Sequence, residues 1–230
     1  MLNRSLAAAL AAEVIGTFLL FVIGAGAVIV NAQTGGEVGL LGIALANGLT
    51  LTVLATGFGP ISGAQFNPAV TVALWLVGKV RTIEGLRYIV AQLAGAAAAG
   101  FVLKLAFGGL DAGDSAYAIA GGGVPSLAFG LSQGTGIAVE AVLTALLTYA
   151  VLLTAVDGRA PKMGGLFIGF AVSADIMVGG PLTGAAMNPA RWFGPALALG
   201  DLSGAVIYIV GPLAGAAAAA LSVRYLFSER

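Results

Sequence analysis

Long stretches without a charged residue constrain this fold most strongly. Within its 230 residues the chain has charge-free runs over residues 14–36, 38–78, 88–103, 115–139, 141–156, 163–174, 176–190 and 202–223. A helix that crosses a bilayer needs about 20 apolar residues. The pattern therefore predicts an all-α membrane protein with six transmembrane helices, near residues 6–30, 40–58, 82–106, 131–156, 163–180 and 203–226.

Two apolar stretches remain after the second and fifth predicted spans, at residues 67–78 and 188–199. Each would form a helix about 18 Å long at 1.5 Å per residue, a little over half of a ~30 Å hydrocarbon core. We therefore expect two re-entrant half-helices.

The composition excludes several classes of function. Only 9% of the residues are charged, the net charge is zero, and the chain has neither Cys nor His. Soluble domains carry about 25% charged residues, so residues 1–230 are expected to form a single membrane-embedded domain. Without thiols or imidazoles, we expect no metal, no cofactor and no enzyme activity. The balanced charge argues against a nucleic-acid partner.

The basic residues predict the orientation of the spans. With the N-terminus in the cytoplasm, eight of the ten basic residues fall on the cytoplasmic side, and Lys104 and Arg191 are the two exceptions. This distribution agrees with the positive-inside rule. We expect a multi-pass protein of the plasma or inner membrane, with both termini in the cytoplasm.

The sequence also contains an internal repeat. Tyr88–Gly100 and Tyr208–Ala220 are identical at 10 of 13 positions with an offset of 120, and Glu13 recurs as Glu140. Each half contains three predicted spans, and an odd number forces the second half to insert in the opposite direction. We predict inverted repeats over about residues 1–120 and 121–230, which would place a shared functional element near the bilayer midplane.

Each half contains an Asn-Pro-Ala motif where a half-helix should begin: Asn67, Pro68 and Ala69, and Asn188, Pro189 and Ala190. Asn is a preferred N-cap residue, and Pro suits the first helical position. Two inverted half-helices would bring their positive N-terminal ends together at the midplane, beside two amide donors. Such a site would attract a neutral oxygen and repel cations, as a conduit for water-like molecules requires.

Over essentially its whole length the sequence resembles the aquaporin (major intrinsic protein) family. The resemblance rests on SGAQFNPAV at Ser62–Val70, on MNPARWFGPA at Met187–Ala196, and on Glu13 and Glu140. It implies an aquaporin-like right-handed bundle with one pore per subunit, assembled as a homotetramer in the lipid bilayer. It also implies a channel for water or small neutral solutes.

Glu13 and Glu140 lie in apolar helices, where an ionised group needs partners. Each is expected to accept backbone N–H bonds from the nearby re-entrant loop, which holds the loop carbonyls toward the pore; the alternative is a carboxylate that reaches the interface. The resemblance assigns the pore carbonyls to Gly63, Ala64, Gln65, Phe66, Thr183, Gly184, Ala185 and Ala186.

Channels of this family narrow at four positions, which here are Asn47, Ile176, Ala185 and Arg191. Water channels usually place Phe and His at the first two positions, and glycerol channels place Trp and Gly. The chain lacks these groups, so a wide, non-standard filter is expected, similar to those of plant nodulin-like intrinsic proteins and their bacterial relatives. We expect the bacterial type. Trp192 and Ala196, however, follow the water-channel pattern.

Together these features predict a passive channel for water and small uncharged solutes that excludes protons and ions. Glycerol is the first candidate solute, with urea, ammonia and metalloid hydroxides as further ones. A strictly water-selective aquaporin is the main alternative, and an ion-coupled secondary transporter is a second. Asp175, beside the filter position Ile176, has no single expected role: it could pair with Arg191, shape the vestibule or face a tetramer interface.

Overall fold

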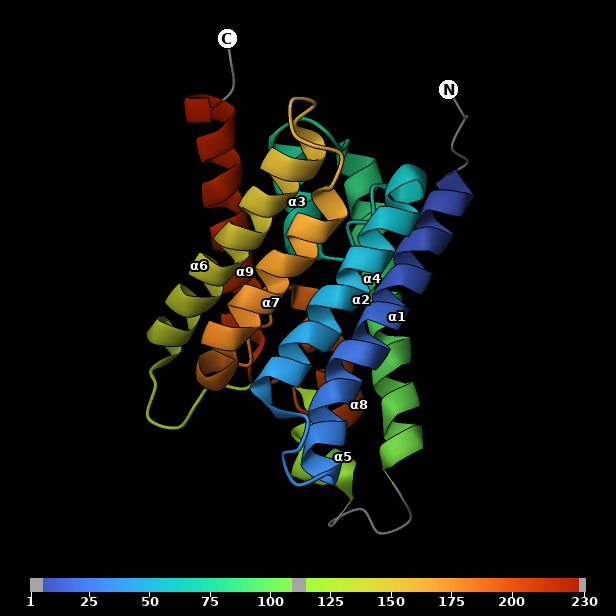
Figure 1. The fold of residues 1–230 in the computed structure, drawn as a ribbon, viewed down its shortest axis with the longest axis vertical. Coiled ribbons are helices and arrows are strands. Elements are labelled where there is room, and N and C mark those ends of the chain that lie inside the picture. Colours follow the sequence, from blue (N-terminus) through green and yellow to red (C-terminus); the bar gives the residue numbers. More distant parts are fainter. Residues whose placement is uncertain (1–5, 109–114, 228–230) are drawn as a thin grey trace.

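A computed structural model describes residues 6–108 and 115–227 of the chain. Long helices form a bundle, and the first and last described residues lie at the same end of it, which we call the termini end (Figure 1). The first half contains α1 (Leu6–Gln33), α2 (Gly39–Ser62), the short α3 (Pro68–Leu76) and α4 (Thr82–Phe107). The connection that follows contains α5 (Ala116–Ile119) and a 3₁₀ turn at Gly121–Gly123.

The second half repeats this order of long and short helices. It contains α6 (Gln133–Val151), α7 (Gly164–Thr183), the short α8 (Pro189–Leu199) and α9 (Ala205–Ser222). Single π-helical turns extend α6 over Leu152–Val156 and α9 over Val223–Phe227. In the described part of the chain, six helices are long and apolar enough to cross a membrane. The prediction of an all-α membrane fold with six spans and two half-helices is therefore confirmed.

Two of the helix ends that differ from the predicted ones have the same cause. The second and fifth spans end at Ser62 and Thr183, a few residues beyond the predicted ends at 58 and 180. The prediction stopped before Pro60 and Pro181, yet both prolines lie inside their helices. The helices end instead where Gly63 and Gly184 adopt left-handed conformations, with φ of 90° and 77°. Glycine favours this C-terminal cap because it has no Cβ.

The two halves pack into each other. Within each half, the first helix packs against the second and third long helices, as α1 does against α2 and α4. Between the halves, α2 packs against α7, and each half-helix lies against a long helix of the other half: α3 against α9 and α8 against α4. The half-helices therefore sit between the two repeats, with α3 toward the termini end and α8 toward the opposite end (Figure 1).

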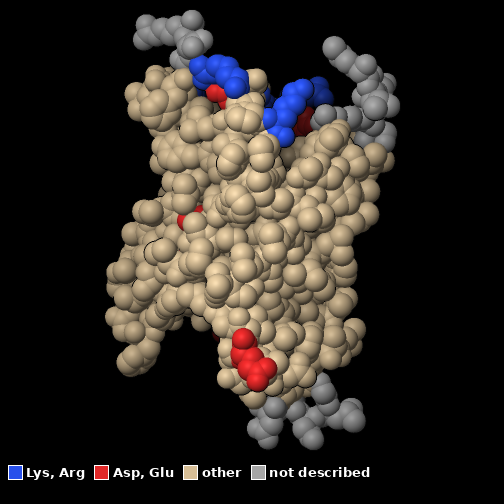
Figure 2. Space-filling view, in the orientation of Figure 1, with Lys and Arg blue, Asp and Glu red and all other residues tan. Residues whose placement is uncertain are grey.

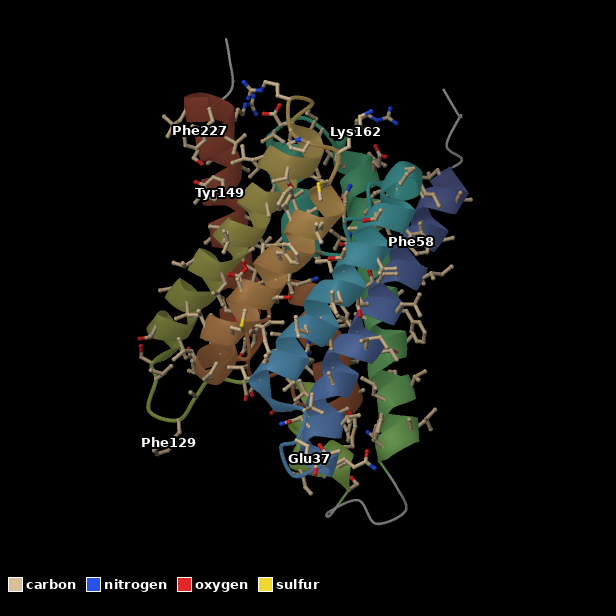
Figure 3. All side chains as sticks on the ribbon, viewed as in Figure 1. Glu37, Phe58, Phe129, Tyr149, Lys162 and Phe227 are labelled. Carbon is tan, nitrogen blue, oxygen red and sulfur yellow. The ribbon has the colours of Figure 1, made fainter. Side chains whose placement is uncertain are left out.

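The outer surface is suited to lipid. Many large apolar side chains are exposed on the sides of the bundle, including Val53, Val90, Leu105 and Val142. In Figure 2 the lysines and arginines gather at the termini end, and the surface below them is almost entirely uncharged. Figure 3 places Lys162 at the termini end and Glu37 at the opposite end. Arg4 and Arg230, two of the basic residues used to predict the orientation, lie outside the described residues.

Candidate functional site

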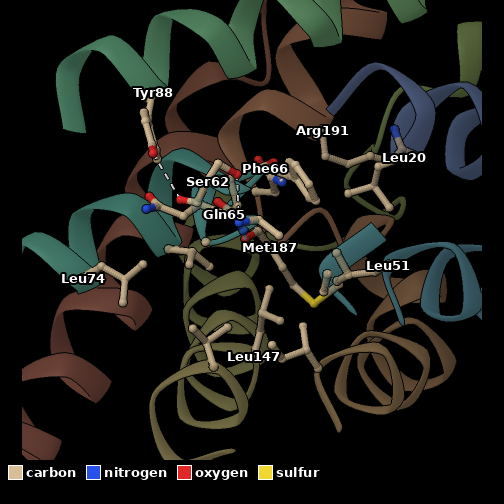
Figure 4. A pocket seen from close by; sticks show the side chains of 18 of the residues that line it. Leu20, Leu51, Ser62, Gln65, Phe66, Leu74, Tyr88, Leu147, Met187 and Arg191 are labelled. Atoms are coloured by element: carbon tan, nitrogen blue, oxygen red, sulfur yellow. Dashed lines mark hydrogen bonds between the residues drawn. The ribbon is translucent and has the colours of Figure 1, made fainter. Parts of the chain in front are cut away.

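One cavity of about 1040 Å³ runs through the bundle. It extends from residues 79–84 at the termini end, past both Asn-Pro-Ala motifs, to Arg191. One part of its wall is apolar, with side chains that include Leu20, Leu51, Leu74, Leu147 and Val172. Another part is formed by residues 63–67 and 184–188, which connect each long helix to its half-helix (Figure 4). The charged residues Lys79, Arg81, Glu84 and Arg87 line the cavity at the termini end.

Each half-helix starts at its asparagine. The Oδ1 atoms of Asn67 and Asn188 accept the backbone N–H groups of Ala69 and Ala190, at 2.8 and 2.9 Å. Both asparagines are extended, and a proline occupies the first helical position after each. These are the features of an N-cap followed by Pro, as expected from the sequence.

The two asparagines also link the repeats. Nδ2 of Asn67 donates to the carbonyl of Met187, and Nδ2 of Asn188 donates to the carbonyl of Phe66, both at 2.9 Å. A primary amide has two N–H donors. Each side chain therefore keeps one donor beyond its cross-repeat bond, and both asparagines line the cavity.

Glu13 holds the first connecting segment. Its fully buried carboxylate accepts the backbone N–H groups of Gln65 and Phe66 at 3.0 and 2.8 Å, and the side chains of Ser62 and Gln92 at 2.6 and 2.8 Å. Four donors compensate a carboxylate that would otherwise be costly in an apolar helix. The carboxylate stays inside the bundle and does not reach the interface.

Glu140 holds the second connecting segment in the same way. It accepts the backbone N–H groups of Ala186 and Met187 at 2.9 and 2.7 Å, and the hydroxyl of Thr183 at 2.6 Å. Thr183 thus takes the place of Ser62, at an offset of 121 residues. Both glutamates accept one hydroxyl and two backbone N–H groups, and Glu13 has Gln92 as a further donor.

These bonds orient the carbonyls. In a trans peptide the N–H and C=O point in opposite directions. Because the N–H groups of residues 64–66 and 185–187 point toward a glutamate or its hydroxyl partner, the preceding carbonyls point the other way. The arrangement places Ala64, Phe66, Ala185 and Met187 at positive φ, a conformation that non-glycine residues seldom adopt. Strain of this kind is concentrated at functional sites.

Six of the eight carbonyls assigned to the pore accept no hydrogen bond within the described residues: Gly63, Ala64, Gln65, Gly184, Ala185 and Ala186. The other two are occupied. The carbonyl of Phe66 accepts from Asn188, and that of Thr183 accepts from the Tyr208 hydroxyl at 2.8 Å. Thr183 does not line the cavity, and Met187 does. In the second half, the predicted segment of pore carbonyls (residues 183–186) begins one residue too early, because Thr183 is still part of α7.

The four predicted filter residues line the same cavity, and all are buried. Arg191 comes from α8, and its Nη1 donates to the carbonyl of Gly123 at 2.9 Å. The side-chain amide of Asn47 is bound to the backbone of α1 and α2: its Nδ2 donates to the carbonyl of Ile43 at 2.8 Å and to that of Gly24 at 3.5 Å. This position consequently contributes space to the cavity rather than a hydrogen-bond donor.

Sequence reasoning missed several supporting residues. Tyr88 and Tyr208 donate their hydroxyls to the carbonyls of Ser62 and Thr183 (the Tyr88 bond is drawn in Figure 4). Tyr88 and Tyr208 open the repeated 13-residue segment, so the 120-residue offset could have identified them. Met187 had no such signal; its side chain points toward the Leu51 side of the cavity (Figure 4).

Asp175 has none of the sequence-derived partners. Its side chain is buried, and it forms no ion pair with Arg191 among the described residues. Oδ2 has no hydrogen-bond partner there, and the residue is not part of the cavity wall. The structure gives no role for this carboxyl group.

Comparisons with known proteins agree with this geometry. The sequence profile of the family described as major intrinsic protein matches residues 2–223. Aquaporin NIP1-3 of Oryza sativa subsp. japonica is 41% identical over 210 residues, which is 91% of this chain and 70% of that protein. Aquaporin TIP2-1 of Arabidopsis thaliana is 40% identical over 220 residues, 91% of this chain and 83% of that one.

A solved structure shows the same fold. The X-ray structure of the aquaglyceroporin from Plasmodium falciparum superposes with a TM-score of 0.86 over 97% of each chain, at 24% sequence identity. The two sequence relatives described above are plant proteins, so they give no support to the bacterial type expected from the filter.

Proposed function

The chain belongs to the major intrinsic protein family and is a multi-pass membrane channel, not an enzyme; we propose that its cavity conducts water and small uncharged solutes passively and excludes protons and ions. One observation carries this proposal: the cavity is lined by apolar side chains, by two asparagine donors, and by two segments whose six carbonyls accept no hydrogen bond within the described residues. A molecule with hydroxyl groups can exchange hydrogen bonds along such a path without ionising.

Ion exclusion follows from the charges beside the path. The N-terminal ends of α3 and α8 meet at the two asparagines, and each carries a partial positive charge. The guanidinium of Arg191 lines the same cavity. The positive helix ends at the asparagines and the guanidinium of Arg191 both raise the energy of a cation in the cavity, including hydronium, while a neutral solute passes.

We further propose a solute range that includes glycerol, with urea, ammonia and metalloid hydroxides as candidates. The filter residues Asn47, Ile176 and Ala185 contribute neither an aromatic ring nor an imidazole, and the Asn47 amide is bound to backbone. A water-selective pore is the alternative, in which the outer connection that binds Arg191 would restrict the path. An ion-coupled carrier is the further alternative; it would need an acidic group beside the asparagines, and the one acidic residue among the described residues that line the cavity is Glu84, at the termini end.

The proposal extends to assembly and location. We propose one channel domain over residues 1–230, built from inverted repeats of about 1–120 and 121–230. It would assemble as a homotetramer in a plasma or inner membrane, with the termini end in the cytoplasm. The basic residues at the termini end support this orientation (Figure 2).

Stopped-flow light scattering on proteoliposomes tests the function. A sucrose shock measures water efflux, and a glycerol gradient measures solute entry. Rapid shrinkage in sucrose followed by rapid re-swelling in glycerol is the expected result. Rapid shrinkage without glycerol entry would establish the water-selective alternative, and shrinkage no faster than in empty liposomes would contradict the channel proposal.

The filter assignment predicts the effect of a double substitution, Asn47→Phe with Ile176→His. A ring at position 47 cannot occupy the space between α1 and α2, where a Cβ on Gly24 would already lie 2.2 Å from Asn47 Oδ1. The ring must therefore enter the cavity. Glycerol permeability should fall about tenfold, which requires only about 1.4 kcal/mol of added barrier, while water permeability changes little.

The matched control for this prediction is Leu45→Phe, which adds the same ring to an exposed position on α2. It should leave both permeabilities unchanged. If glycerol and water permeability fell in parallel in the double variant, positions 47 and 176 would not form a solute filter.

A further inference from the structure

Two basic side chains, at positions related by the repeat, donate hydrogen bonds to backbone carbonyls of the half-helices. Lys104, near the end of α4, donates from Nζ to the carbonyl of Ala198 in α8 at 2.7 Å. Arg224, which follows α9, donates from Nη1 to the carbonyl of Leu76 in α3 at 2.6 Å. The two cations are 120 residues apart, the same offset as the tyrosines that open the repeated segment.

Both acceptors belong to the last turn of a helix, where backbone carbonyls lack helical partners. In α3, the carbonyls of residues 73–75 accept from the backbone N–H groups of residues 77–79. Among the described residues, no backbone N–H donates to the carbonyl of Leu76. In α8, the carbonyl of Ala196 accepts from residues 200 and 201, whereas that of Ala198 accepts, within the described part of the chain, only from Lys104. Each cation thus satisfies a carbonyl that the local backbone does not.

The bonds cross between the repeats. Lys104 belongs to the first half and binds the half-helix of the second; Arg224 belongs to the second half and binds the half-helix of the first. At the N-terminal ends of these helices, the asparagine amides likewise donate to carbonyls of the opposite half. Each half-helix is therefore held by the opposite repeat at its N-terminal and its C-terminal end.

We propose that Lys104 and Arg224 are positioning residues that set the depth of α8 and α3 in the bundle, and with it the places of Asn188, Arg191 and Asn67 along the cavity. A cation at the C-terminal end of a helix also complements the helix dipole. The proposal accounts for Lys104, one of the two basic residues that do not follow the predicted charge asymmetry. The expected effect of these residues on permeation rests on the proposed channel function. Their effect on the position of the half-helices does not.

Hydrogen exchange of the purified, folded protein tests the structural part. In Arg224→Gln, the amides of residues 77–79 should exchange about tenfold faster, a change on the scale of one hydrogen bond from a charged donor. In Lys104→Gln, the amides of residues 200 and 201 should respond instead. Each variant should leave the half-helix of its own repeat unchanged. Lys162→Gln, which removes an exposed cation, is the control.

Water permeability in proteoliposomes, normalised to folded protein, tests the functional part. Both glutamine variants should lose permeability several-fold, and Lys104→Arg and Arg224→Lys should restore most of it because a cationic donor remains. Unchanged exchange, or equal loosening of both half-helices in either variant, would overturn the proposal. So would full permeability in the glutamine variants. A failure of the channel function itself is distinguishable, since the unsubstituted protein would then not conduct while the exchange pattern could still appear.

Discussion

A Glu140→Leu variant is expected to lose water conduction and much of its thermal stability. Leucine removes the acceptor for the Thr183 hydroxyl and for the backbone N–H groups of Ala186 and Met187. Each buried donor left without a partner costs about 1–3 kcal/mol, so the three together cost on the order of 5 kcal/mol. That loss is comparable to the whole stability of many domains, which is about 5–15 kcal/mol.

The connecting segment would also lose its conformation. Ala185 and Met187 are held at φ of 47° and 53°, and the bonds to Glu140 and Thr183 fix the N–H groups of this segment in that conformation. Thermal unfolding in detergent and permeability per folded channel are the measurements. Glu37→Leu, at an exposed position, is the matched control and should behave like the unsubstituted protein. Normal conduction by the Glu140→Leu variant would show that the carbonyls do not depend on this carboxylate.

A Gly194→Ala variant is expected to fold poorly or not at all, because α8 crosses α4 at this glycine. A Cβ on Gly194 would lie 2.1 Å from the carbonyl oxygen of Ala96 and 2.4 Å from its carbon. Both are backbone atoms, so no side-chain rotation relieves the clash, and the two helices must separate. Overpacking of a core typically costs about 1–3 kcal/mol and more where the backbone must move.

The measurement is the yield of monodisperse protein in size-exclusion chromatography, followed by water permeability of what folds. Gly57→Ala is the control: it lies in α2, and an added Cβ there meets no atom within 4 Å. Alanine also favours a helix over glycine by about 1 kcal/mol, so this variant should be at least as stable as the unsubstituted protein. Equal yields of the two variants would mean that α4 and α8 can separate without harm.

The six spans, the two half-helices and the asparagine caps could be predicted from the sequence, because they depend on neighbours along the chain. Apolar length predicts a span, and an Asn-Pro pair before an apolar stretch predicts where a short helix begins. The Gly63 and Gly184 helix ends were within reach of the same local reasoning. The predicted ends at residues 58 and 180 fell short of them, because apolar length alone does not locate a helix end.

Which groups face the cavity depends on the packing of the helices in three dimensions. The carbonyl of Thr183 is taken by Tyr208, the Asn47 amide turns to the backbone of α1 and α2, and Lys104 reaches a carbonyl 94 residues away. Each of these pairings depends on how closely two helices cross and on which side of the crossing a side chain lies. That geometry is set by packing between the two halves, and no local pattern along the chain encodes it.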